Sequence, residues 1–149
     1  MFERYAETAR RLIFAAEYEA ALCGSPQVEP EHLLLAVLKQ EDDAPLCRLL
    51  TRDERKSIAT QITERLQTNH RVDPKVTVSM SLPMKVVLAQ SMEASEKALE
   101  SRYIGPEHVL LGLLKEPDGV AARLLKQHGI ARDRVLDELG ATWPVPPRR

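Results

Sequence analysis

Two copies of a short motif hold most of the residues in this chain that could do chemistry. Residues 29–39 read Glu-Pro-Glu-His-Leu-Leu-Leu-Ala-Val-Leu-Lys, and residues 105–115 read Gly-Pro-Glu-His-Val-Leu-Leu-Gly-Leu-Leu-Lys. Proline suits the first turn of a helix because its missing N–H would be unpaired there, so each copy predicts a helix with Glu31 or Glu107 near its start. A carboxylate in that place complements the positive end of the helix dipole. It could equally bind a cationic group of a partner, and both interpretations of Glu31 and Glu107 stay open at this point.

A histidine follows each of these glutamates. His32 and His108 could ligate a metal, but no H-E-x-x-H or C-x-x-C motif accompanies them. We interpret both as packing or capping residues and expect no metal site.

The two cysteines, Cys23 and Cys47, lie 24 positions apart without a flanking cationic motif. A nucleophile needs an oriented base, and the sequence names none, so we interpret both as small buried hydrophobes. The six glycines fit neither a phosphate-binding P-loop nor a dinucleotide-binding G-x-G-x-x-G. We therefore expect no cofactor and no enzymatic activity, with a small Cys- or His-dependent hydrolase as a remote alternative.

Helical periodicity governs the elements that must position these residues. It predicts a long amphipathic helix over residues 2–23 and further helices over about 30–39, 44–51, 53–67 and 82–101, with a short extended piece at 76–78. The apolar runs at 33–38 and 109–114 indicate central core helices. Phe2 and Tyr5 either close one end of the bundle or line a docking groove.

The motif repeat extends along the chain. Its copies start 76 residues apart, seven of the eleven pairs are identical, and residues 2–23 match residues 82–100. We expect an all-α fold made of two tandem four-helix repeats, about eight helices in total. The first repeat covers about 2–67, a linker about 68–81 and the second repeat about 82–140, with a Pro-rich tail or linker start at 141–149.

Composition excludes several classes of protein. The chain has 149 residues, 44% hydrophobic and 29% charged, with a net charge of −1, which is typical of one soluble globular domain. The near-zero charge argues against general phosphate attraction and so against nucleic-acid binding. The apolar runs are too short for a membrane span, and the N-terminal residues do not read as a secretory signal. We expect a cytoplasmic protein.

The two P-E-H-[LV]-L-L-[AG]-[VL]-L segments, each preceded by an amphipathic helix, resemble the Clp repeat. This repeat occurs as a tandem pair in the N-terminal domain of Clp-family AAA+ unfoldases of the ClpA and ClpC type. The resemblance covers about residues 2–140 and includes Asp-Gly-Val-Ala-Ala at 118–122, which is similar to the family's E-G-[IV]-A-A. It implies a pseudo-two-fold helical bundle that docks protein substrates and adaptors and passes them to an ATPase ring.

The resemblance also gives the glutamates a role. In ClpC-like relatives, the glutamate at this motif position binds the guanidinium of phosphoarginine on proteins marked for degradation, which implies substrate or adaptor binding at Glu31 and Glu107. Pro30 and Pro106 replace the family's threonine, and proline offers a phosphate neither a hydroxyl nor an N–H. They argue against phosphoarginine itself. The function expected is a non-catalytic interaction module for a Clp-type unfoldase; the alternative is an accessory subunit that binds a Clp ATPase or peptidase ring.

Overall fold

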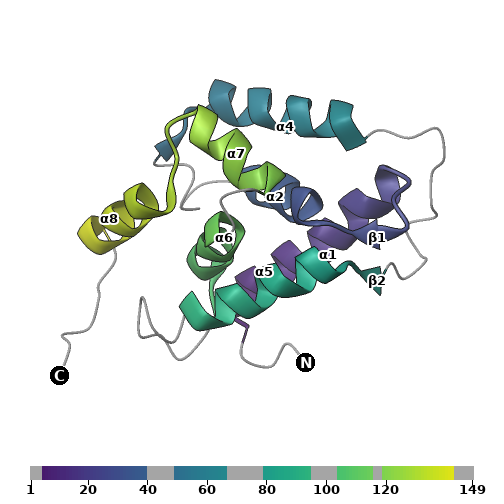
Figure 1. Ribbon diagram of the computed structural model, residues 1–149, viewed down its shortest axis with the longest axis horizontal. Coiled ribbons are helices and arrows are strands. Elements are labelled where there is room, and N and C mark those ends of the chain that lie inside the picture. The colour runs from purple at the N-terminus through teal and green to yellow at the C-terminus, as the bar shows by residue number, and fades with distance from the viewer. Residues whose placement is uncertain (1–4, 40–48, 67–78, 95–103, 116–118, 143–149) are drawn as a thin grey trace.

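The protein is all-α apart from one two-stranded sheet. The computed structural model describes residues 5–39, 49–66, 79–94, 104–115 and 119–142. The helices are α1 (Glu7–Leu22), α2 (Pro30–Leu38), α4 (Arg52–Leu66), α5 (Leu82–Glu93), α6 (Pro106–Lys115), α7 (Val120–Gln127) and α8 (Arg132–Thr142), and the strands are β1 (Gln27–Val28) and β2 (Ser79–Met80) (Figure 1). The expected fold class is confirmed.

Helices α2 and α6 form the centre of the bundle. Every residue from His32 to Leu38 and from Glu107 to Leu114 is buried. Helix α1 packs along α2, and α5 packs along α6. On their other sides, α4 covers α2, while α7 and α8 cover α6 (Figure 1). A helix that is apolar all round needs neighbours on every side, and this explains why the two most hydrophobic segments lie innermost.

Two equivalent backbone hydrogen bonds express the pseudo-two-fold symmetry and join the repeats. The N–H of Ala6, just before α1, donates to the carbonyl of Ile104, just before α6, at 2.8 Å. The N–H of Ser81, just before α5, donates to the carbonyl of Val28, just before α2, at 3.1 Å. A parallel bridge between Tyr5 and Ile104 and the parallel β1–β2 pair accompany these bonds. Each repeat therefore contributes one chain segment to each join.

The helix expected from residue 2 begins only at Glu7, which corrects the sequence prediction. Tyr5 pairs with Ile104, and Ala6 has extended backbone angles (φ −61°, ψ 155°). The apolar spacing of Tyr5 and Ala6 continues the helical pattern, but both residues are held by the second repeat rather than by the first turn of α1.

The helix expected over 30–39 is correct within one residue at both ends, and those expected from 53 and from 82 are correct within one residue at their starts; their expected ends, 67 and 101, lie outside the described residues. The helices expected over 30–39 and 53–67 are α2 and α4, and the one expected over 82–101 is α5 up to Glu93. Most of the expected helix at 44–51, the extended piece at 76–78, Phe2, Cys47 and most of the tail lie outside the described residues. The division into repeats, linker and tail stays a prediction.

Candidate functional site

The two histidines of the motif close the starts of α2 and α6 in the same way. The backbone N–H of Glu29 donates to His32 Nδ1, and that of Gly105 donates to His108 Nδ1, each at 2.8 Å. These bonds satisfy one orphan donor at each helix end, and they confirm the capping role expected for both histidines.

Both imidazoles are neutral and deeply buried. Burial lowers the pKa of His32, against an upward influence of the Glu19 carboxylate, and burial lowers the pKa of His108 to about 4. Because His108 Nδ1 accepts a hydrogen bond, the proton is on Nε2, and the 3.4 Å contact of Nδ1 with Glu107 Oε1 is no ion pair. Among the residues described, neither Nε2 has a hydrogen-bond partner.

Glu107 is folded away from solvent. Its side chain is only 7% exposed, and its carboxylate accepts a hydrogen bond from its own backbone N–H. A Cβ added to Gly105 would lie 2.5 Å from Glu107 Oε1, closer than a Cβ atom approaches a nonbonded oxygen. The carboxylate therefore occupies space that only a glycine at position 105 leaves open. Burial raises the pKa of Glu107.

Glu31 faces a different neighbour, because Glu29 stands where the second repeat has Gly105. Glu31 also accepts a hydrogen bond from its own N–H, but it remains half-buried. Its pKa is raised by burial first and by the Glu29 carboxylate second, whereas its backbone N–H and the Arg65 guanidinium act in the opposite direction. Glu31 is thus a partly dehydrated carboxylate within reach of an incoming group.

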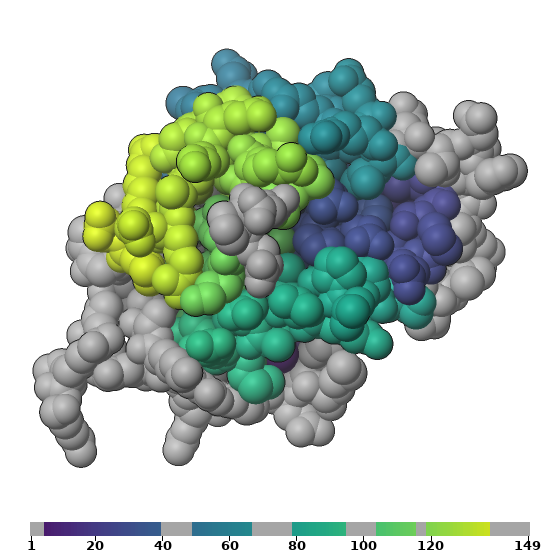
Figure 2. Space-filling view, in the orientation of Figure 1, coloured from purple at the N-terminus to yellow at the C-terminus, as the bar shows by residue number. Residues whose placement is uncertain are grey.

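Glu31 lies on the rim of a groove with apolar walls. The groove has a volume of about 440 Å³, and we call it the α2–α5–α7 groove; its lining residues are Glu29, Pro30, Glu31, Pro83, Val86, Val87, Leu113, Gly119, Val120 and Ala121. The starts of α2, α5 and α7 meet here, and Figure 2 shows α5 crossing the face below α2 and α7. It combines residues of both repeats, so neither repeat could form it alone.

A second groove lies beside α1, and only its residues Thr8, Arg11 and Leu12 have counterparts in the lining of the α2–α5–α7 groove. The second groove has about 310 Å³ and is lined by Thr8, Arg11, Leu12, Ala15, Glu19, Ala36 and Lys39. The equivalent bonds of Ala6 and Ser81 set the register between α1 and α5, so Thr8, Arg11 and Leu12 correspond to Pro83, Val86 and Val87. Lys39 Nζ contacts Glu19 Oε1 at 2.5 Å across the second groove. Thr8, Arg11, Glu19 and Lys39 give this groove four residues with polar or charged side chains, whereas Glu29 and Glu31 are the two such residues that line the α2–α5–α7 groove.

Comparisons with known proteins agree with this arrangement. The family model for the Clp repeat (R) N-terminal domain matches residues 4–128 and, again, residues 80–144. The chain belongs to the Clp repeat N-terminal domain family. The Bacillus subtilis protein "Negative regulator of genetic competence ClpC/MecB" is 32% identical over 95% of this chain, which spans 18% of the length of that relative.

Two solved structures resemble this Clp-repeat domain along nearly its whole length. The N-terminal domain of the caseinolytic protease associated chaperone ClpD from Arabidopsis thaliana is 27% identical, with a TM-score of 0.68 and 95% of each chain covered. A protein from a study of a malarial protein secretion system has a TM-score of 0.82 at 19% identity, with 97% of this chain and 99% of that chain covered, and it supports the fold alone.

Tyr5 is a core residue: it is buried, and its hydroxyl donates to the Leu88 carbonyl at 3.2 Å. Cys23 is buried as expected, and its pKa is raised by burial and by Glu19, against a downward influence of Lys39. The thiol keeps its proton, which argues against a nucleophile.

Two structural findings bear on metals and membranes. In the described part of the Clp-repeat domain, no three His, Cys, Asp or Glu side chains lie close enough together to hold a metal ion. No helix within the same residues is both long and apolar enough to span a bilayer.

The sequence analysis did not predict the apolar residues that line the α2–α5–α7 groove. A comparison of the two repeats could have indicated them. Pro83 and Val86 are apolar where the first repeat has the polar residues Thr8 and Arg11, whereas Val87 and Leu12 are both apolar. Pro83 is exposed and Val86 is half-buried, so these two substitutions mark the surface that differs between the repeats.

Proposed function

We propose that this Clp-repeat domain is a non-catalytic module that docks segments of other proteins, substrates or adaptors of a Clp-type unfoldase, in the α2–α5–α7 groove. Glu31 recognises an arginine or lysine of the docked segment, and the groove walls take its apolar neighbours. The observation that carries this proposal is a half-buried carboxylate on the rim of an apolar groove of about 440 Å³.

The size and chemistry of the groove suit side chains of a peptide. Ligand pockets commonly measure about 300–1,000 Å³ and combine apolar walls with a few polar groups that fix orientation. Val86, Val87 and Val120 supply such walls here. Covering them with a leucine or valine of a partner removes apolar surface from water, which is the main source of affinity in such sites.

The charge on the rim favours a cation. Burial raises the pKa of Glu31 most, and repulsion by the nearby Glu29 carboxylate raises it further. A guanidinium placed between the two carboxylates relieves this repulsion and forms charge-assisted hydrogen bonds, which arginine can make in pairs with a carboxylate. Acidic segments meet the same two carboxylates and are repelled.

The start of α2 is poorly suited to a phosphate. Pro30 has no N–H, the N–H of Glu31 is bonded to its own carboxylate, and the N–H of His32 donates to the Glu29 carbonyl at 3.0 Å. A phosphate at a helix start needs such donors, and here it would instead face two carboxylates. We therefore assign unmodified arginine or lysine, rather than phosphoarginine, to Glu31.

Fluorescence anisotropy with a labelled 12-residue peptide, Arg flanked by Leu and Val, tests the proposal. Glu31→Gln removes a charge-assisted contact worth about 1.5–3 kcal/mol, so we expect binding to weaken at least about tenfold. Val120→Asp places a charge in the wall and weakens binding by a similar factor. A peptide with Glu in place of Arg, or with phosphoarginine, binds more weakly than the original.

Glu107→Gln is the matched control, because it makes the same change at the equivalent motif position outside the groove. We expect its affinity to stay within about twofold of that of the natural chain, with circular dichroism confirming that each variant is folded. Equal affinities for Glu31→Gln and the natural chain, or equal losses for the two variants, would contradict a role for Glu31.

A further inference from the structure

An exposed leucine stands beside the α2–α5–α7 groove. Leu82, the first residue of α5, is 74% exposed, more than any other large hydrophobic side chain in the described residues. Single exposed leucines are common on protein surfaces, but Leu82 has apolar neighbours. Pro83 follows it directly, and Val86 lies one helical turn further on, on the same side of α5. Both neighbours line the groove, so the apolar wall of the groove continues along α5 onto Leu82.

The first repeat has polar side chains at all three of these places. In the register of α1 and α5, the counterparts of Leu82, Pro83 and Val86 are Glu7, Thr8 and Arg11. Arg11 Nη2 and Glu7 Oε1 form an exposed ion pair at 2.7 Å. The fold therefore accepts a solvated polar pair at the start of this helix, and the apolar surface is a property of the second repeat alone.

The start of α5 gains nothing from a leucine. A carboxylate in the first helical turn complements the helix dipole, and Glu7 gives α1 such a charge, whereas the first turn of α5 has none. Ser81 already caps α5, because its hydroxyl accepts a hydrogen bond from the Met84 N–H at 3.2 Å. Leu82 thus serves neither the cap nor the buried core, which points to a role in contacts with another molecule.

Leu82 and Val86 are spaced to match an extended peptide. Four residues of α-helix rise about 6 Å, and two residues of an extended chain rise about 6.6 Å. Alternate side chains of an extended chain point to the same side. A segment that runs along α5 therefore sets one side chain against Val86 and the next but one against Leu82.

We propose that the segment docked in the α2–α5–α7 groove continues along the start of α5 and places a second apolar side chain on Leu82. This inference rests on the proposed function and narrows its substrate class. The docked segment is extended, and it carries an arginine or lysine for Glu31 and two apolar residues separated by one residue. A helical segment does not fit, because residues two apart on a helix do not face the same side.

Fluorescence anisotropy with three labelled 12-residue peptides tests the proposal. Each peptide contains one arginine and one of the triplets Leu-Ser-Leu, Leu-Leu-Ser or Leu-Ser-Ser. The triplet follows the arginine in one series and precedes it in another, because the groove sets no chain direction. We expect the natural chain to bind the Leu-Ser-Leu peptide about fivefold more tightly than each of the other two. The Leu-Leu-Ser peptide has the same composition, so this preference measures spacing rather than hydrophobicity.

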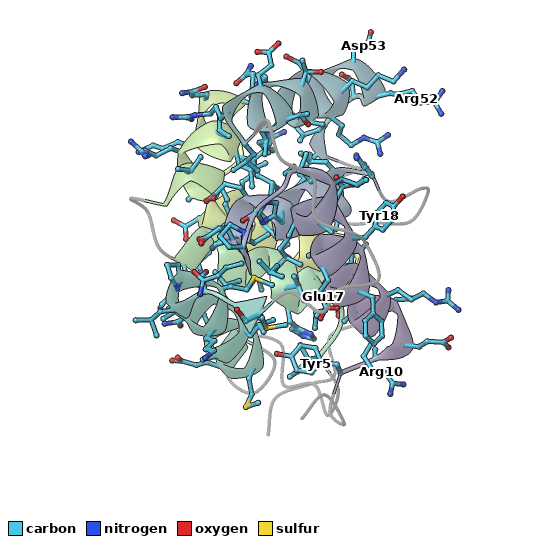
Figure 3. All side chains as sticks on the ribbon, turned by 90° about the vertical axis from the view of Figure 1, so that its right-hand side faces the viewer. Tyr5, Arg10, Glu17, Tyr18, Arg52 and Asp53 are labelled. Carbon is cyan, nitrogen blue, oxygen red and sulfur yellow. The ribbon has the colours of Figure 1, made fainter. Side chains whose placement is uncertain are left out.

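Leu82→Gln removes the apolar surface and adds no charge, so we expect the preference for Leu-Ser-Leu to shrink to within about twofold. Tyr18→Gln is the matched control: Tyr18 is 52% exposed, and Figure 3 shows it projecting from α1 on the side away from α5. It should keep the full preference, with circular dichroism confirming that both variants are folded. A full preference in Leu82→Gln, or equal affinities of the natural chain for Leu-Ser-Leu and Leu-Leu-Ser, would overturn the proposal.

Glu31→Gln separates this proposal from the proposed function. We expect it to weaken all three peptides by the same factor, because Glu31 and Leu82 contact different side chains of the segment. Binding that depends on Glu31 but shows no spacing preference contradicts the role of Leu82 alone. A spacing preference that Glu31→Gln leaves at full affinity contradicts the role of Glu31 alone, and no binding of any peptide contradicts both.

Discussion

At the scale of residues, the two motif copies place identical side chains in unequal environments. His32 and His108 occupy the same position in the motif and make the same capping bond. Glu31 and Glu107 differ in their neighbours: the Glu107 carboxylate lies where a Cβ at position 105 would be, whereas Glu31 stands near the Glu29 carboxylate. The sequence predicted both glutamates near helix starts. It could not predict which one reaches a groove, because that depends on side chains packed around each carboxylate.

The buried histidines make the stability of the protein sensitive to acid. His108 has a pKa of about 4 when folded and about 6.5 when unfolded. Between these values the unfolded chain binds a proton that the folded chain does not, so the free energy of unfolding falls as pH is lowered from 6.5 toward 4. The lowered pKa of His32 adds to this loss, whereas the raised pKa values of Glu31 and Glu107 oppose it.

His108→Asn tests this account, since an asparagine oxygen can accept the Gly105 N–H without titrating. We expect the loss of stability between pH 6.5 and 4 to shrink by about 3 kcal/mol, or less where other groups compensate. Urea unfolding at several pH values, monitored by circular dichroism, measures this loss of stability. An unchanged pH dependence would show that His108 is protonated equally well in the folded chain.

At the scale of elements, the close approach of α5 and α6 depends on Gly112. A Cβ at that position would lie 2.3 Å from Ser91 Oγ and 2.7 Å from the Val87 carbonyl oxygen. The first repeat has Ala36 at the equivalent position. The sequence predicted both core helices from their apolar runs, but a glycine within such a run did not reveal that a neighbouring backbone touches it. The predicted start of α1 was wrong for a similar reason, because Tyr5 pairs with Ile104, which is far away in the sequence.

Gly112→Ala should destabilise the protein although alanine is the better helix former by about 1 kcal/mol. Overpacking against backbone costs about 1–3 kcal/mol, so we expect a net loss on the order of 1 kcal/mol, measured as a lower midpoint of urea unfolding. Ser91→Ala added to Gly112→Ala should not restore stability, because the Val87 carbonyl stays in place. Full rescue by Ser91→Ala would show that only the hydroxyl is in the way.

At the scale of the whole molecule, the two repeats form one core. The Ala6–Ile104 and Ser81–Val28 hydrogen bonds cross between the repeats, and α2 contacts α5, α6 and α7 of the second repeat. The duplicated motif predicted two related halves from seven identical pairs. The pairing of segments across the two halves depends on contacts between residues far apart in sequence. Helical periodicity carries no information about such contacts.

Cutting the chain at about residue 73 should leave two poorly folded fragments, because each exposes apolar faces that the other half covers. We expect each fragment alone to have low helicity and no cooperative thermal transition by circular dichroism, and an equimolar mixture to regain helicity. Cooperative unfolding of either fragment with nearly full helicity would contradict a shared core.

The claim that the α2–α5–α7 groove docks peptides is tested most directly by titrating the isotopically labelled chain with the Arg-containing peptide and recording backbone amide resonances. We predict that the largest shifts belong to Glu29, Glu31 and nearby residues 86–87 and 119–121, and that Glu31→Gln abolishes them at the same peptide concentration. Shifts centred instead on the second groove, at residues 8–19, or no shifts at saturating peptide, would contradict it.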